Sequence, residues 1–205
     1  MRARENPFRT HRLERLAFRH ASLGGVVALR ERFAQMGQRG AIVGPHGSGK
    51  TTLLRELGTQ LEAEGLRVSR RYLNAESDPP ASARELLRQA RSLCDGDVLL
   101  FDGADQLPRF TWRRLVRAAR RASGIVATAH GEGLLPTLVR TSTNAALLDE
   151  LMQELVGDLA RELRPLLREL FETHRGNLHE VLLALYDLAA RDDPRLVGAR
   201  SSRSG

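Results

Sequence analysis

The chain has 205 residues, of which 41% are hydrophobic, 28% are charged and 4% are aromatic. This apolar content suffices for one substantial core and excludes wholesale disorder. With one cysteine, Cys94, no internal disulfide can form, and no apolar run reaches the ~18 residues of a membrane helix. We therefore expect a cytoplasmic protein without membrane insertion. The formal net charge of +7 comes from arginine, since Lys50 is the only lysine.

The first 39 residues are expected to form an N-terminal arm and two helices that pack on the core. The apolar residues Leu13 and Leu16 fit one helix at 12–20, and Leu29 and Phe33 fit a second at 26–36. Two glycines at 24–25 separate the helices. The core is predicted to begin at residue 40.

The sequence from Gly44 to Thr51 matches the phosphate-binding pattern G-x-x-x-x-G-K-[ST] at every fixed position. An apolar strand at 39–43 precedes it and an amphipathic helix follows it. Glycines let successive backbone N–H groups point at phosphates, Lys50 would reach the β- and γ-phosphates, and the Thr51 hydroxyl would ligate Mg²⁺. The predicted nucleotide-binding residues are Gly44, Pro45, His46, Gly47, Ser48, Gly49, Lys50, Thr51 and Thr52.

A second buried strand at 97–102 ends in Asp102, the predicted Walker B acid and, with Thr51, a magnesium ligand. The glutamate that usually follows this acid is replaced by Gly103. Two other acids, Asp105 and Glu132, are candidates for polarising the attacking water, and the sequence does not choose between them. Weak hydrolysis, or binding without turnover, is an open alternative.

The remaining elements predict a parallel sheet with flanking helices, because strands and helices alternate along the chain. We expect strands at 66–73, 124–129 and 135–140, helices at 82–94 and 110–122, and a turn at 77–80. The strand at 124–129 leads to His130, and both Thr128 and His130 are candidates for sensing the γ-phosphate. An ordinary exposed loop histidine is an equally open interpretation of His130.

Strand patterns stop after residue 143, where the predicted core ends. Leucine-rich segments at 145–156, 158–172 and 177–190 predict a small helical lid at 144–191. The last segment, 192–205, is rich in Gly, Ser and Arg and is expected to be disordered. The expected fold is thus α/β, a parallel-sheet P-loop NTPase core with a C-terminal helical lid.

This combination resembles AAA-type P-loop ATPases of the secretion-helper and transposition-helper kind. The resemblance rests on Asn6-Pro7-Phe8, the P-loop, the Asp102 strand, the strand ending at His130 and the segment Gly176-Asn177-Leu178-His179-Glu180-Val181-Leu182. That last segment is similar to the sensor 2 region, where the family usually has arginine at the position of His179. Arg175 is the alternative basic residue.

Three function classes compete. The first is a slow Mg-dependent ATPase that acts as a motor or switch, with Lys50, Asp102 and Asp105 as catalytic residues and with ATP and Mg²⁺ as cofactors. The others are a non-hydrolysing nucleotide-binding or nucleic-acid-interacting protein, and a small-molecule kinase. A GTPase is disfavoured because the guanine motif N-K-x-D needs a second lysine.

The predicted helix at 110–122 carries five arginines: Arg113, Arg114, Arg117, Arg120 and Arg121. A solvated face is the plain interpretation of this composition. The two functional interpretations are a contact with phosphates of nucleic acid and an arginine finger offered to a neighbouring subunit. The sequence therefore leaves open a nucleic-acid partner, a protein partner and an oligomer.

Overall fold

The computed structural model describes residues 25–73, 79–191 and 193–196, and it comprises two compact units. One unit holds the sheet and consists of residues 22–44 and 50–141, of which 25 onward are described. The other holds the C-terminal helices and includes residues 45–49 and the chain from 142 onward. The predicted N-terminal arm and the helix at 12–20 lie outside the described residues.

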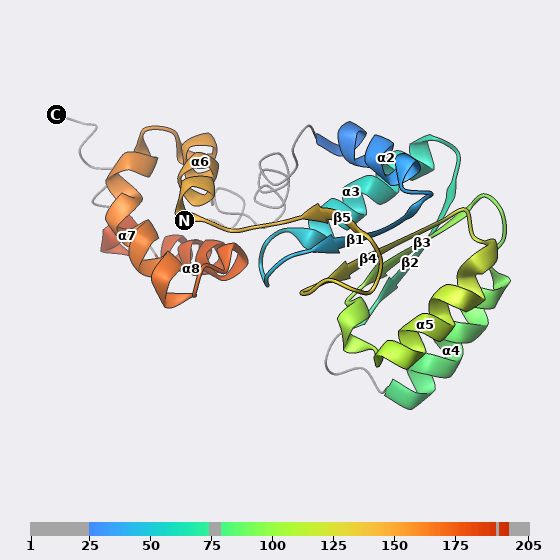
Figure 1. Ribbon diagram of the computed structural model, residues 1–205. Coiled ribbons are helices and arrows are strands. Elements are labelled where there is room, and N and C mark those ends of the chain that lie inside the picture. Colours follow the sequence, from blue (N-terminus) through green and yellow to red (C-terminus); the bar gives the residue numbers. More distant parts are fainter. Residues whose placement is uncertain (1–24, 74–78, 192, 197–205) are drawn as a thin grey trace. The chain divides into compact units, whose positions relative to one another are not determined.

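The first unit is built on a five-stranded sheet in which every pair of neighbours is parallel. This confirms the predicted parallel sheet (Figure 1). The strand order is β2-β3-β4-β1-β5, so that β1, β3 and β4 are central. Their bounds are β1 Arg39–Val43, β2 Arg67–Tyr72, β3 Asp97–Asp102, β4 Gly124–Ala129 and β5 Thr137–Arg140.

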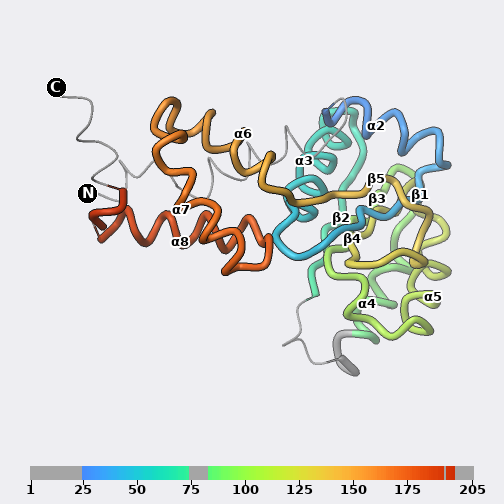
Figure 2. The backbone as a smooth tube through the Cα atoms, turned by 60° about the vertical axis from the view of Figure 1, so that its left-hand side comes forward, coloured from blue at the N-terminus to red at the C-terminus, as the bar shows by residue number. Residues whose placement is uncertain are grey.

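Helices cover both faces of this sheet (Figures 1 and 2). On one face lie α2 (Gly25–Gln35) and α3 (Lys50–Ala63), and on the other lie α4 (Pro79–Ser92) and α5 (Arg109–Ala118). Coverage on both sides explains why β3 and β4 are almost wholly buried, whereas the edge strand β2 is half-exposed. The core beneath α4 and α5 includes Phe101, Trp112 and Leu115.

Most predicted boundaries shift by one to four residues, and three of these differences are informative. The predicted turn at 77–80 is wrong at its second half, because α4 already begins at Pro79, and proline favours the first turn of a helix. The predicted helix at 110–122 ends earlier, at Ala118, and continues as a short 3₁₀ turn, η2, over Ala119–Arg121. The last strand begins at Thr137.

The amino-terminal edge of the sheet is closed by side chains that bond to loop backbone. The half-buried Arg39 guanidinium donates hydrogen bonds to the carbonyl oxygens of Gln38 (3.0 Å), Ser123 (3.1 Å) and Ala122 (2.8 Å). Burial lowers the pKa of Arg39. Nearby, the Ser123 hydroxyl donates to Asp95 Oδ1 and accepts from the Gly96 N–H. These contacts tie the starts of β1, β3 and β4 together.

The second unit contains α6 (Ala145–Val156), α7 (Leu159–Thr173) and α8 (Leu178–Ala190). Asn144 and Asn177 cap α6 and α8, since their side chains accept hydrogen bonds from the Leu147 and Glu180 N–H groups. The unit has its own core of leucines, to which Leu196 from the predicted tail also belongs. None of the described helices is long and apolar enough to span a bilayer.

Candidate functional site

The loop between β1 and α3 has the backbone that the motif predicts. Gly47 and Gly49 have φ angles of 69° and 81°, in the left-handed region that glycine adopts without strain. The Ser48 hydroxyl donates to the Pro45 carbonyl oxygen (2.8 Å), and the Gly44 N–H donates to the Ala129 carbonyl oxygen (3.1 Å). The turn is therefore held by its own residues and by the end of β4.

Gly47 has a second reason to be glycine. Within the unit that contains residues 45–49 and the C-terminal helices, a Cβ on Gly47 would lie 1.8 Å from Asn177 Oδ1 and 3.2 Å from the His179 backbone nitrogen. Any side chain at this position would collide with the cap of α8. This contact involves the segment that resembles sensor 2, and His179 contributes its main chain to it.

Lys50, the first residue of α3, is half-buried in the sheet unit. Its Nζ atom donates a hydrogen bond to the Gly44 carbonyl oxygen at 2.8 Å. Burial lowers the pKa of Lys50, while the charges of Asp105 and Asp102 raise it. The charges of two of the three acids singled out in the sequence therefore act on the single lysine of the chain.

Asp102 ends β3 at the carboxyl edge of the sheet and is 9% exposed. The Thr128 hydroxyl on β4 donates a short hydrogen bond to Asp102 Oδ1 and accepts one from the Gly103 N–H at 2.9 Å. Thr128 thus orients the predicted metal-binding carboxylate directly. Phe101 pairs with Ala127 in the parallel register of β3 and β4, so the next residues on these strands, Asp102 and Thr128, lie side by side. The sequence patterns of the separate strands do not reveal this register.

Asp105 and His130 form a close pair at the same edge. Asp105 Oδ2 lies 2.5 Å from His130 Nδ1 and accepts a hydrogen bond from the His130 backbone N–H at 3.0 Å. Burial raises the pKa of Asp105, but the two hydrogen bonds and the charge of His130 outweigh it, so the pKa is lowered overall. The sequence named both residues for different roles, and the structure brings them together.

Gly103, in the position of the usual glutamate, has a backbone that only glycine fits. Its φ angle is 80°, and a Cβ there would lie 2.4 Å from the Leu73 carbonyl oxygen. Leu73 is fixed because its N–H donates to the Asp102 carbonyl oxygen at 3.0 Å. A glutamate at position 103 would therefore be disfavoured by the backbone conformation and by the contact of its Cβ with Leu73.

Glu132, the other candidate for activating water, is engaged elsewhere. Its Oε1 atom accepts a hydrogen bond from the Thr137 hydroxyl at 2.8 Å and forms an ion pair with Arg140. Both partners lie on β5, so these contacts tie the loop after β4 to the edge strand. Asp105, in contrast, lies beside His130 at the carboxyl edge of the sheet, and its charge raises the pKa of Lys50.

A comparison with protein families identifies the chain. A family model described as "AAA domain" matches residues 35–192, well over half of the sequence. The chain belongs to the AAA domain family. This AAA domain is accordingly an ATP-binding P-loop protein, and the resemblance noted from its motifs is confirmed at the level of the family.

Solved structures agree with this AAA domain in fold. The crystal structure of a DNA replication initiation factor aligns with a TM-score of 0.56 and 17% identity over 86% of this chain and 63% of that chain. The AAA domain thus spans less than two thirds of that protein. A point mutant of RuvB from Thermotoga maritima (14% identity, 88% and 69% coverage, TM-score 0.46) and PCH-2 from C. elegans (14%, 93% and 67%, 0.40) align less well, and no argument rests on them. No curated protein matches the sequence.

Proposed function

We propose that this AAA domain binds Mg-ATP and hydrolyses it slowly, acting as a nucleotide-dependent motor or switch of the secretion-helper or transposition-helper kind. The observation that carries the proposal is the grouping of Lys50, Asp102 and Asp105. Lys50 is the first residue of α3, Asp102 is the last residue of β3, Asp105 follows three residues later, and the charges of both acids raise the pKa of Lys50. A mere glycine turn before a helix would need neither the lysine nor the acids.

The residues present fit the nucleotide and its metal. The left-handed Gly47 and Gly49 allow a loop whose N–H groups face phosphates, and α3 starts at Lys50 with the positive end of its dipole. Gly44 to Thr52 would hold the phosphates, with Thr128 and His130 near the γ-phosphate. Magnesium, when bound, neutralises charge on the phosphate oxygens.

Thr51 and Asp102 are the residues that would hold the metal. Among the described residues, no group of three His, Cys, Asp or Glu side chains could bind a metal ion by itself. A site made of one hydroxyl and one carboxylate therefore needs phosphate oxygens to complete it, as in P-loop proteins. This supports magnesium entering together with ATP.

Slow hydrolysis follows from the groups available to hold the attacking water. Gly103 offers no carboxylate, and Glu132 is bonded to Thr137 and Arg140. The Asp105 carboxylate, with its lowered pKa, is ionised at neutral pH and keeps the His130 ring in place. We infer that Asp105 and His130 act as a unit that orients the water less effectively than a glutamate would.

The test is steady-state phosphate release by the purified protein, with and without Mg²⁺, alongside calorimetry with ATP. We expect magnesium-dependent turnover below the typical enzyme median of about 10 s⁻¹. Absence of ATP binding would overturn the proposal. Binding without any turnover would support the non-hydrolysing alternative, and phosphate transfer to a small molecule would support the kinase.

A further inference from the structure

Helix α5 presents two sharply different sides. On the inner side, Trp112 and Leu115 are buried, the Trp112 ring meets Phe101 edge to face at 5.4 Å, and its Nε1 donates to the Leu134 carbonyl oxygen. These contacts fix the rotation of the helix. The outer side consists of five exposed residues, which we call the arginine face: Arg109, Phe110, Arg113, Arg114 and Arg117.

In the part of the chain that the structure describes, no acid is paired with the arginine face. From Arg109 to Arg121 the sequence has six arginines and no acidic residue. Across the described residues, no carboxylate lies within ion-pair distance of any of these six. Like charges on one helix repel one another, and a bound anion would relieve this repulsion.

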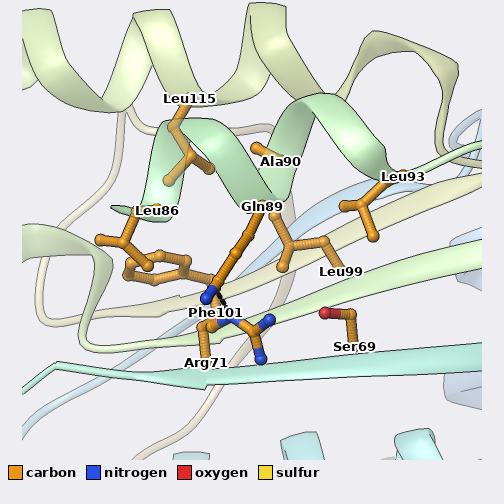
Figure 3. A pocket seen from close by; sticks show the side chains of 9 residues that line it. All are labelled: Ser69, Arg71, Leu86, Gln89, Ala90, Leu93, Leu99, Phe101 and Leu115. Atoms are coloured by element: carbon orange, nitrogen blue, oxygen red, sulfur yellow. Dashed lines mark hydrogen bonds between the residues drawn. The ribbon is translucent and has the colours of Figure 1, made fainter. Parts of the chain in front are cut away.

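Other arginines of the same unit are occupied, which makes the contrast informative. Arg67 bonds to Asp97, Arg70 to Glu62, and Arg88 to Glu85. Figure 3 shows Arg71 beside an apolar hollow between β2 and α4, where its Nε donates to Gln89 Oε1. General replacement of lysine by arginine explains the number of arginines, but it does not explain why those of α5 lack acids.

Phe110 lies among these cations and is 70% exposed. Residues 113, 114 and 117 are three, four and seven positions beyond it, which places their side chains around the ring on one side of the helix. The Arg114 guanidinium lies 5.6 Å from the centre of the ring. An exposed aromatic ring within a basic surface suits a planar, electron-rich ligand that also carries negative charge.

The basic surface extends beyond α5. Helix α4 packs against α5 on the same side of the sheet and adds the exposed Arg84 and Arg91 (Figures 1 and 2). The η2 turn adds Arg120 and Arg121. Exposed arginines are therefore present on the helix that packs against α5 as well as on α5 and the η2 turn.

We propose that the arginine face binds single-stranded nucleic acid, with the arginines on the phosphates and Phe110 stacked on a base. An acidic protein would match the charge, but it gives no reason for an exposed aromatic ring among the arginines. A duplex would match the charge too, but its bases are not open to stacking from the side. The combination of ring and arginines favours the single strand.

The first experiment measures binding of fluorescent dT₂₀ and rU₂₀ at salt concentrations from about 50 to 200 mM. We compare the parent with the triple variant Arg109→Gln, Arg113→Gln, Arg117→Gln, which keeps the Arg114–Phe110 contact. Three lost phosphate contacts should weaken binding at least tenfold and reduce the slope of log K against log salt by about 2. Stronger binding of rU₂₀ than of dT₂₀ would indicate a contact with the 2′-hydroxyl group. Equal binding would indicate that the protein contacts only the phosphates and the bases.

The control variant removes the same charge from another helix: Arg161→Gln, Arg164→Gln, Arg168→Gln on α7. There Glu162 and Glu169 alternate with the arginines and Arg164 pairs with Asp149, so little change in binding is expected. An equal loss of affinity in both triple variants would show that binding depends only on the net charge of the protein, and this would overturn the proposal. So would the absence of binding at about 50 mM salt.

Phe110→Ala tests the stacking. Affinity for dT₂₀ should fall roughly tenfold with the salt slope unchanged, since no charge is lost. Duplex DNA bound as tightly as dT₂₀, with no effect of Phe110→Ala, would overturn the single-strand assignment. Displacement of dT₂₀ by polyglutamate at equal charge concentration would assign the face to an acidic protein instead. Thermal melting confirms that each variant is folded.

Discussion

The two edges of the sheet are both rich in polar groups, yet they are built differently. At the amino-terminal edge, Arg39 gives its hydrogen bonds to backbone carbonyl oxygens, and Ser123 connects neighbouring turns. At the carboxyl edge lie charged side chains, and the charges of Asp102 and Asp105 raise the pKa of Lys50 against the effect of its burial. The first arrangement stabilises the fold, and the second provides charged groups for binding a ligand. We therefore expect substitutions at the amino-terminal edge to lower stability and substitutions at the carboxyl edge to lower nucleotide binding or turnover.

The largest effect is expected for Lys50→Ala at the carboxyl edge. The ammonium group would contact the phosphates, and its loss leaves their charge uncompensated, so ATP affinity should fall at least about 100-fold. Calorimetry with ATP measures this directly. The melting temperature should change less than the ATP affinity, because Lys50 is half-buried and does not belong to the apolar core of the sheet unit. Unchanged ATP affinity would refute the P-loop assignment.

Asp102→Asn should preserve part of the nucleotide affinity and lower the rate of magnesium-dependent turnover about 100-fold. The amide keeps the size of the side chain and a partner for the Thr128 hydroxyl, but loses the charge that would hold the metal. Phosphate release measured over a magnesium titration tests this. If the variant turns over at the parent rate, Asp102 is only the end of a strand.

Arg39→Met tests the opposite edge. Methionine keeps the apolar stem and removes three hydrogen bonds to carbonyl oxygens, each worth roughly 1 kcal/mol, so the free energy of unfolding should drop by about 2–3 kcal/mol. Chemical denaturation provides the measurement. ATP affinity below the melting transition should match the parent, and a selective loss of ATP binding would contradict the comparison of the edges.

The smallest effect is expected for Asp105→Ala. Removing the carboxylate takes away the Asp105 contact of the His130 ring and should lower phosphate release about tenfold with ATP affinity nearly intact. His130→Ala provides the matched variant, and the double variant should be no slower than either single one if the pair acts as a unit. Additive losses would separate the roles of the two residues.

Much of this arrangement is predictable from local sequence patterns. The P-loop, the strand ending in Asp102 and the strand ending near His130 follow from apolar runs, glycines and one lysine. Contacts between residues far apart in the sequence are not predictable in this way. The bonds from Thr128 to Asp102 and from His130 to Asp105 depend on the register of β3 with β4, and the occupation of Glu132 depends on the position of β5.

The composition likewise does not indicate which arginines are paired with acids. The sequence shows how many there are, but only the packing of acids around Arg67, Arg70 and Arg88 distinguishes them from the arginine face. Helix periodicity places Trp112 inward and the arginines outward. Whether an acid from another element reaches the arginines is a property of the tertiary structure.

The backbone at Gly103 has a consequence for how this protein can change. Codons for glycine and glutamate differ by as little as one base, so a reversal to the usual acid is genetically close. Such a reversal would force a side chain against the Leu73 carbonyl oxygen, 2.4 Å from where its Cβ would lie, and would need a left-handed backbone that glutamate adopts poorly. A glutamate at this position would therefore fit only if the loop after β3 and the residue that follows β2 changed together.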